Sequence, residues 1–431
     1  MTILGWICVL IALAVLVLWL AALAFIAAGL RAMPRLRVAE SGPSDAEADL
    51  VSVIMPAHNE VSVIDEALTL LRASTYRQIE IIVVADRCTD GTVAVVNRHV
   101  EEDERVRLVE TSECPEGWSG KCHAAWQGYQ QSQGRWLLFT DADTLFDPAL
   151  IQAAVALATR RSLDLLSLLG NLSGTKPFEK TAQPVAAMTL MTIFPIQKAN
   201  RADPARRRPF ANGQFMLFTR SGYETIGTHE QARAALLEDL YFALWAKKRG
   251  LRAGVTVAGR LFRVRMYDSQ EAFINGWKRI LTEATNRNIP RLQRIALRLH
   301  LQTLAGPCAA ICCFVGSWMA RIEGWGVWGL VAAVSLAALV AQIAALWLAY
   351  PLSGASRWSM WRYPWGCLAC ALLVRSAVDD LKTRRGIQWA DLHYDVQDKV
   401  ERQPLTAAIR DRLSSPSAAD GATKKKGTGT D

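Results

Sequence analysis

The sequence lacks the cysteine and glycine patterns that mark several common cofactor and metal folds. Its nine cysteines are odd in number and scattered, which excludes a regular disulfide framework and favours a reducing compartment. Cys114 and Cys122 have no second pair to complete a zinc site, and Cys367 and Cys370 lie in an apolar run. Neither a Walker-type loop nor a GxGxxG fingerprint is present. A phosphate-binding site in this chain therefore needs something other than a glycine-rich loop.

The charge pattern argues against nucleic acid as a partner. The 431 residues carry a formal net charge of +9. The lysines and arginines mostly flank apolar segments and are not interleaved with aromatic residues on a polar face, as nucleic-acid binding favours. We therefore expect no nucleic acid. The basic balance suits anionic lipid or a phosphate-bearing substrate.

Hydrophobic residues make up 51% of the chain and gather near its two ends. Residues 1–30 hold an almost uninterrupted apolar run, and no Lys or Arg precedes it as in a signal peptide. We predict a retained transmembrane anchor there and a linker over residues 31–49. Because Arg31, Arg35 and Arg37 follow the run, the positive-inside rule places the next domain in the cytoplasm. A multi-pass protein of the inner membrane is expected.

Further membrane segments are predicted over residues 303–381. Two spans fit residues 303–320 and 327–350. Residues 364–378 are short and contain Arg375, which favours a re-entrant or interfacial segment over a third span. Two spans return the basic residues that follow to the cytoplasm, whereas three would place them outside.

Two polar stretches flank these segments. Residues 288–302 place apolar and basic residues on different faces at helical spacing. This favours an amphipathic helix in the headgroup layer over one packed on the soluble domain. Residues 382–431 form a predicted cytoplasmic tail, which is small and polar from about residue 414 onward and is expected to be disordered there.

Residues 50–287 are predicted to form one soluble domain, in which short apolar runs alternate with stretches of helical spacing. The predicted strands are 51–55, 80–84, 106–110 and 136–140, and the helices between them are 63–74, 91–100 and 120–131. Continuous apolar strands in this alternation predict an α/β fold. Its sheet should be mostly parallel, with helices on both faces.

Polar groups follow three of these strands, namely His58-Asn59-Glu60, Asp86-Arg87 and Asp141-Ala-Asp143. Each group alone is compatible with an ordinary turn. Together they bring carboxylates to the sheet edge where open α/β sheets bind ligands. We therefore interpret them as parts of one site.

The pair Asp141 and Asp143 favours a metal site. Two carboxylates after a buried strand are costly unless they bind a cation or accept hydrogen bonds. Oxygen ligands with few partners suit Mg²⁺ or Mn²⁺, which take further oxygens from water and substrate phosphate. Lys121, at a predicted helix start, is a candidate second contact for a diphosphate, or else a solvated lysine.

A second acidic pair, Glu238 and Asp239, lies among Leu, Tyr and Phe residues in a stretch of helical spacing. Such surroundings disfavour the charged form of a carboxyl and raise its pKa. One of the two is therefore a candidate base for removing the proton of an acceptor hydroxyl.

Several short motifs follow one another along the chain in a characteristic order: Pro56-Ala-His-Asn-Glu60, Asp86 with Thr89-Asp-Gly-Thr92, Asp141-Ala-Asp143 and Glu238-Asp239. In this order they resemble family 2 glycosyltransferases with the GT-A fold. Two more motifs, Gly117-Trp-Ser-Gly-Lys121 and Ala211-Asn-Gly-Gln214, resemble the membrane-bound subgroup that includes hopanoid-associated, carotenoid and ceramide glycosyltransferases. The similarity covers roughly residues 50–287, followed and preceded by membrane segments as in that subgroup.

The resemblance implies how the donor would bind. Ala57, Glu60 and Asp86 would hold the base and ribose of a nucleotide-sugar, expected to be a UDP-sugar. Asp141 would contact the ribose or the metal, and Asp143 would contact the metal.

It also implies an inverting reaction. Asp239 would be the general base, with Glu238 beside it, and the acceptor hydroxyl would attack the anomeric carbon in line. The metal would stabilise the leaving nucleoside diphosphate.

The sequence departs from the family pattern at several points. The usual double Asp after the second strand is Ala85-Asp86, followed by Arg87, which puts the identity of the donor in question. The QxxRW motif of processive synthases is absent, and Gly276-Trp-Lys-Arg279 does not match it. Trp389-Ala-Asp-Leu-His-Tyr394 keeps only the aromatic frame of a C-terminal signature, so we assign it no catalytic role. Transfer of a single sugar is favoured over polymerisation.

The sequence therefore predicts a metal-dependent transferase that moves one sugar from a nucleotide-sugar to a membrane lipid. Two rivals stay open. One is transfer to a polyprenyl phosphate, which needs no deprotonation. The other is a nucleotide-sugar-binding membrane protein without turnover.

Overall fold

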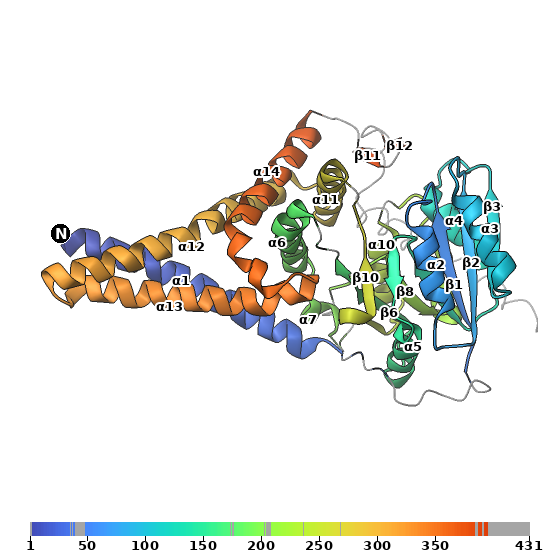
Figure 1. The fold of residues 1–431 in the computed structure, drawn as a ribbon, viewed down its shortest axis with the longest axis horizontal. Coiled ribbons are helices and arrows are strands. Elements are labelled where there is room, and N and C mark those ends of the chain that lie inside the picture. The colour runs from blue at the N-terminus through green and yellow to red at the C-terminus, as the bar shows by residue number, and fades with distance from the viewer. Residues whose placement is uncertain are drawn as a thin grey trace, which may run out of the picture.

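The computed structural model describes residues 2–383, except for 35, 37, 39–47, 173, 175, 202, 204–207, 236 and 268, and also the backbone of 387–389 and 392–394. Figure 1 shows an α/β domain joined to a long bundle of helices, with the N-terminus at the far tip of the bundle. Most of the predicted linker and nearly all of the predicted tail lie outside the described residues.

The α/β domain is built on a seven-stranded sheet in the order β3-β2-β1-β4-β8-β6-β9. All pairings are parallel except those of β8, which runs antiparallel to both of its neighbours. The predicted mostly parallel sheet is thereby confirmed. The strands are β1 (Val51–Ala57), β2 (Ile79–Asp86), β3 (Val106–Thr111), β4 (Trp136–Thr140), β6 (Leu165–Leu169), β8 (Phe215–Thr219) and β9 (Ala253–Val257).

Helices cover both faces of the sheet because its central strands are apolar throughout. Val53 and Met55 of β1 belong to the core under α2 (Ile64–Arg72) and α5 (Leu150–Arg160). Ile54, between them, belongs to the core under α4 (Gly120–Gln130) and α10 (Glu238–Lys248). Successive side chains of β1 therefore enter opposite cores.

The remaining elements complete the domain. A small sheet of order β5-β10-β7 lies beside the main one, and a two-stranded ladder joins β11 to β12. The strands of these two small sheets are β5 (Thr144–Phe146), β7 (Asn171–Leu172), β10 (Phe262–Val264), β11 (Ile387–Trp389) and β12 (Leu392–Tyr394). The short helices not yet named are α3 (Thr92–Glu102), α7 (Ile196–Ala199), α8 (Arg220–Thr225), α9 (Thr228–Gln231) and η2 (Gly259–Leu261).

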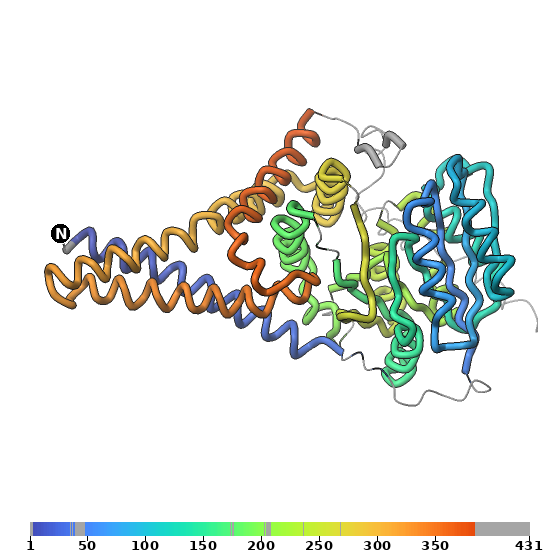
Figure 2. Tube along the Cα trace, viewed as in Figure 1, coloured from blue at the N-terminus to red at the C-terminus, as the bar shows by residue number. Residues whose placement is uncertain are grey.

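Three helices of the bundle are long and apolar enough to cross a membrane: α1 (Thr2–Ala32), α12 (Ile289–Glu323) and α13 (Gly326–Ala349). They lie side by side in Figures 1 and 2. Large apolar side chains are exposed on them, among them Ile3 at 78% and Phe314 at 70%. Because water disfavours such a surface, these helices indicate association with a membrane.

The predicted interfacial helix and the first predicted C-terminal span form one continuous helix, α12. Its first turns bury Leu292, Ile295 and Leu299 against the protein. The location of these turns in the headgroup layer stays a prediction.

Three helices lie between the bundle and the sheet: α6 (Pro177–Ile193), α11 (Gln270–Ala284) and α14 (Tyr363–Lys382) (Figure 1). Two short turns, η3 (Tyr350–Ser353) and η4 (Arg357–Arg362), connect α13 to α14. Helix α14 covers the short predicted segment at 364–378. It buries Cys367, Cys370 and Val374 in the core that it shares with α6 and α12.

Helix α4 lies unusually close to the sheet because Gly128 faces β1. A Cβ at Gly128 would lie 2.5 Å from Ile54 Cγ2 and 3.0 Å from Val84 Cγ2. Both neighbours are fully buried, so neither has room to move.

We expect Gly128→Ala to destabilise the protein, because the added methyl group overpacks this contact by about 1–3 kcal/mol. For a domain of this size, each kcal/mol lowers the melting temperature by about 2–4 °C. Thermal unfolding of the full chain in detergent measures the change.

Gly326→Ala is the matched control, since a Cβ at that helical position meets nothing within 4 Å. Its melting temperature should stay the same or rise slightly, because Ala favours helix over Gly. Equal melting temperatures for the two variants would contradict the close packing of α4.

Candidate active site

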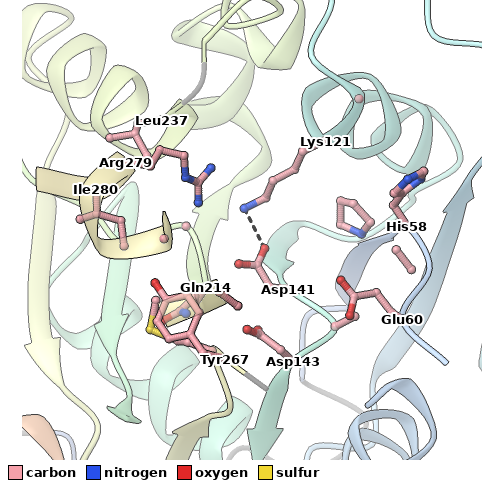
Figure 3. Close-up of a pocket in the computed structure, with 18 of the residues that line it drawn as sticks. His58, Glu60, Lys121, Asp141, Asp143, Gln214, Leu237, Tyr267, Arg279 and Ile280 are labelled. Atoms are coloured by element: carbon pink, nitrogen blue, oxygen red, sulfur yellow. Dashed lines mark ion pairs between the residues drawn. The ribbon is translucent and has the colours of Figure 1, made fainter. Parts of the chain in front are cut away.

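A cavity of about 620 Å³ lies at the carboxyl ends of β1, β2 and β4 (Figure 3). Its volume is within the range of ligand pockets. The structure brings together in this cavity all the residues that the sequence singled out: Ala57, Glu60, Asp86, Lys121, Asp141, Asp143, Glu238 and Asp239. They come from segments up to 182 positions apart, from Ala57 to Asp239.

Two loops on the β1 and β2 side of the cavity interlock. The side-chain oxygen of Asn59 accepts a hydrogen bond from the Thr89 backbone N–H at 2.8 Å. In return, Thr92 Oγ1 accepts one from the Glu60 N–H at 2.9 Å. Asn59 has a φ of 57°, a backbone conformation that is costly for a residue with a Cβ. The Thr89–Thr92 segment therefore holds the loop that presents Glu60.

Asp86 is already paired in the structure. Its two carboxylate oxygens accept hydrogen bonds from Arg87 Nε at 2.9 Å and from Arg87 Nη2 at 2.7 Å. Thr111 Oγ1 donates a third at 3.1 Å. A Cβ on Gly120 would lie 2.5 Å from this guanidinium, so the pair rests against the start of α4. Arg87, the residue that departs from the family pattern, thus lines the cavity beside Asp86.

Lys121 joins two of the acidic groups. Its Nζ lies 2.7 Å from Asp141 Oδ1 and 2.8 Å from Glu238 Oε1. Burial disfavours the ammonium charge, but the two carboxylates outweigh it and raise the pKa of Lys121. The sequence left open a solvated lysine. The structure instead places Lys121 in an ion triad, with its side chain 24% exposed.

The pair Glu238 and Asp239 begins helix α10, and its two carboxyls differ in environment. Lys121 overcomes the effect of burial on Glu238 and lowers the pKa of that carboxyl. Asp239 accepts a 3.0 Å hydrogen bond from the Gly213 N–H. Burial, and then the charge of Glu238, raises the pKa of Asp239 to about 7. Asp239 is therefore the member poised to exchange a proton near neutral pH.

Gly213 has no room for a side chain. A Cβ there would lie 3.0 Å from Glu238 Oε1 and 3.4 Å from Lys121 Nζ. The backbone of the Ala211–Gln214 segment thus approaches the ion triad closely. This accounts physically for a glycine in the motif that the sequence analysis quoted.

The turn that carries Asp141 and Asp143 is held by hydroxyl groups. Thr144 Oγ1 donates to the Asp141 carbonyl at 2.7 Å, and Thr140 Oγ1 donates to the Gln214 carbonyl at 2.9 Å. Asp143 Oδ1 is buried and has no hydrogen-bond partner among the described residues. Burial, followed by the charges of Asp141 and Glu60, raises the pKa of Asp143 well above its ordinary value.

These features fit a divalent cation. An unpaired carboxylate oxygen beside further carboxylates is costly unless a cation compensates it. The described residues hold no preformed group of three or more His, Cys, Asp or Glu ligands. A site with two carboxylates fits Mg²⁺ or Mn²⁺, because these ions keep waters and take the remaining oxygens from substrate phosphate.

The cavity also contains residues that the sequence analysis did not select. Tyr267 follows β10, and Arg279 lies on α11. Arg279 belongs to the Gly276-Trp-Lys-Arg279 group, which was compared only with a synthase motif. Its position in the cavity depends on where α11 packs, so sequence spacing gave no direct signal. Asn212 and Gln214, from a motif that the sequence did reveal, complete the lining.

Part of the chain matches a known family, and the chain is similar to several glycosyltransferases. Residues 52–227 match the model of the family described as Glycosyl transferase family 2. The chain is similar to an uncharacterized glycosyltransferase of Haemophilus influenzae, with 30% identity over 94 residues, which are 22% of this chain and 36% of that protein. It is also similar to 4,4'-diaponeurosporenoate glycosyltransferase of Staphylococcus aureus, with 26% identity over 252 residues, which are 56% and 63% of the two chains. The match thus spans less than two thirds of either relative's length.

Among solved structures, the chain is similar to a mannosyltransferase from Pyrobaculum calidifontis in complex with GDP-Man and Mn²⁺. The identity is 18%, the match covers 94% of this chain and 99% of that one, and the TM-score is 0.44. The segment that matches glycosyl transferase family 2, residues 52–227, holds strands β1 to β8 of the α/β sheet and most of the ordered motifs.

Proposed function

We propose that this protein is an inverting glycosyltransferase that uses a divalent cation to move one sugar from a nucleotide diphosphate sugar to a membrane lipid. The observation that supports it best is that one cavity contains both a candidate cation site, Asp141 and Asp143, and a candidate base, Asp239. A transferase needs one group for the leaving diphosphate and one for the acceptor proton.

The donor side would lie next to β1 and β2. Ala57, Glu60 and Asp86 are the residues proposed to hold the base and ribose, and the interlocked loops give them a rigid frame. Asp141 and Asp143 would hold Mg²⁺ or Mn²⁺, which when bound offsets the charge of the diphosphate. A UDP-sugar is the proposed donor. It would bind next to the ion pair that Asp86 forms with Arg87.

Asp239 is the proposed general base. As the acceptor oxygen approaches the anomeric carbon, the Asp239 carboxylate would take its proton. Glu238 stays ionised by pairing with Lys121, and its charge raises the pKa of its neighbour. We therefore assign Glu238 and Lys121 to positioning the site and setting its charge, while Asp239 transfers the proton.

The lipid acceptor and the membrane location are proposed from the three apolar helices. With these helices in a bilayer, the α/β domain would lie beside it, and the arginines after α1 favour the cytoplasmic face of the inner membrane. The similar Staphylococcus aureus protein is named for transfer to 4,4'-diaponeurosporenoate.

Asp239→Asn should abolish most of the transfer activity while leaving donor binding intact, because the amide cannot accept a proton. We expect kcat to fall by ~10²–10⁴-fold, the usual contribution of a general base. Product formation by mass spectrometry and donor affinity by calorimetry are the two measurements.

Glu104→Gln, at an exposed site away from the cavity, is the control and should match the parent protein. Unchanged kcat in Asp239→Asn would remove Asp239 from the role of base.

The transfer rate should depend on pH through Asp239. The carboxyl acts as a base only when ionised, and its pKa is raised to about 7 by burial and then by Glu238. Below that pH, the ionised fraction falls about tenfold per pH unit, so the rate to a hydroxyl acceptor should fall with it. Rates measured across this range at fixed cation concentration test the slope. A rate that stays level from about pH 5 to about pH 7 contradicts the assignment.

Asp143→Ala should weaken binding of Mn²⁺ and of the donor together, because the variant removes the buried oxygen that lacks a protein partner. We expect at least about tenfold weaker Mn²⁺ affinity, as for loss of one charged ligand. Calorimetric titration of UDP with and without Mn²⁺ measures the coupling. If UDP binding is independent of Mn²⁺ in the parent protein, the proposed cation site is wrong.

A further inference from the structure

A second cavity, of about 140 Å³, adjoins the first one on the Asp239 side. The two cavities share Asn212, Gln214, Leu237 and Asp239 in their linings. In Figure 3, Leu237 and Ile280 lie on the opposite side of the first cavity from His58 and Glu60. Asp239 therefore stands between the proposed donor pocket and a separate space.

The second cavity is apolar because two helix faces line it. The α6 residues in the lining are Ala187, Leu190 and Met191, which lie at helical spacing. Each side chain is partly exposed, although α6 lies between the bundle and the sheet. Trp277, Ile280 and Ala284 form the corresponding face of α11. The three α6 residues and Ile280 of α11 are partly exposed, whereas Trp277 and Ala284 are buried, so the apolar space between the helices is bounded mainly by the α6 face and Ile280.

The position of the cavity favours a ligand that comes from the bilayer. Helices α6 and α11 lie between the apolar bundle and the sheet (Figure 1). Leu352 and Ser353 of η3, directly after the candidate span α13, also line the cavity. A lipid that approaches from the bundle would reach Asp239 without crossing the donor pocket.

The charges of the lining favour a neutral ligand. Asp239 is the one ionisable side chain among the described residues that line the second cavity. Lys121, in the first cavity, is already paired with two carboxylates. A phosphate placed here would meet a carboxylate in apolar surroundings, which is costly without a cation. A hydroxyl group carries no such penalty.

The volume sets how much of the ligand fits. An apolar cavity of about 150 Å³ holds a molecule the size of benzene. The cavity of about 140 Å³ therefore takes only the end of a lipid body, and the remainder would lie toward the bundle. A phosphodiester headgroup between the hydroxyl and the apolar body would take up much of this volume and leave little for the apolar body.

We propose that this cavity is the acceptor site and binds the apolar end of a neutral lipid whose hydroxyl is attached directly to that apolar body. The hydroxyl lies at Asp239. Its oxygen forms the bond to the anomeric carbon, its proton passes to the Asp239 carboxylate, and the bond from that carbon to the diphosphate oxygen breaks with its electron pair leaving on the diphosphate. This inference rests on the proposed function and names the class of its acceptor.

A matched pair of probes tests the charge argument. The full chain in detergent receives Mn²⁺, a panel of UDP-sugars and either a long-chain prenol or its monophosphate, which share one apolar body. We expect glycosylation of the prenol and at least about tenfold less of the phosphate, a ratio that corresponds to one buried unfavourable charge contact. Transfer to the phosphate but not to the prenol would overturn the inference and leave glycosyl transfer itself standing.

A matched pair of variants tests the location. Ala187→Trp fills the cavity from α6 and should lower transfer to the prenol by about tenfold or more, as a bulky side chain competes for the space. Lys180→Trp adds the same bulk at an exposed position of α6 and should transfer at the parent rate. Binding of UDP with Mn²⁺ reports whether Ala187→Trp is folded, and Ala187→Phe replaces it if that binding is lost.

Two results distinguish the failure of this inference from the failure of the proposed function. Parent-level transfer by Ala187→Trp, with donor bound, would place the acceptor elsewhere while keeping the transferase. Donor binding without transfer to either probe would overturn the lipid acceptor, and the acceptor site with it.

Discussion

The ammonium group of Lys121 is the contact on which the rest of the site depends. It lies between Asp141, at the end of β4, and Glu238, at the start of α10, and it extends from the first turn of α4. Three elements that are distant in sequence are thereby fixed around one charge. Lys121 balances Asp141 and Glu238. For Asp143 and Asp239, the described part of the chain shows no ion pair with a Lys or Arg side chain. One of them is suited to a metal ion, and the other to a proton.

This division of charge also separates the two halves of the proposed reaction in space. The acidic turn after β4 and the interlocked loops after β1 and β2 face the donor side. Asp239 faces the apolar cavity between α6 and α11. In the proposed reaction, Glu238 acts on the donor pocket through its ion pair with Lys121. Its neighbour Asp239 lines the proposed acceptor cavity directly. In the proposed reaction, a donor and an acceptor that enter from opposite sides would meet at Asp239, as an in-line displacement needs.

The membrane helices act on the site through the layer formed by α6, α11 and α14. Helix α14 buries Cys370 against α6, and its core includes Trp277 of α11. The bundle thus supports the helices that line the second cavity. Removal of the apolar helices would be expected to disturb this layer before it disturbs the sheet, whose core is formed by residues of the α/β domain. The apolar wall of the second cavity is thus formed by helices that pack against the candidate membrane helices, which supports the proposed lipid acceptor.

The sequence by itself determined the elements whose signals are local. Uninterrupted apolar runs such as Val51–Met55 and Glu80–Val84 specify buried parallel strands, and turn chemistry at their ends places His58, Asp86 and Asp141 at one edge. The tertiary structure alone decided which side chains pair. The ion triad of Lys121, the partnerless oxygen of Asp143 and the entry of Arg279 into the cavity depend on distances between elements, which sequence spacing does not encode. The second cavity is lined by residues between 169 and 353, and it exists only where α6, α11 and the loops around them meet in three dimensions.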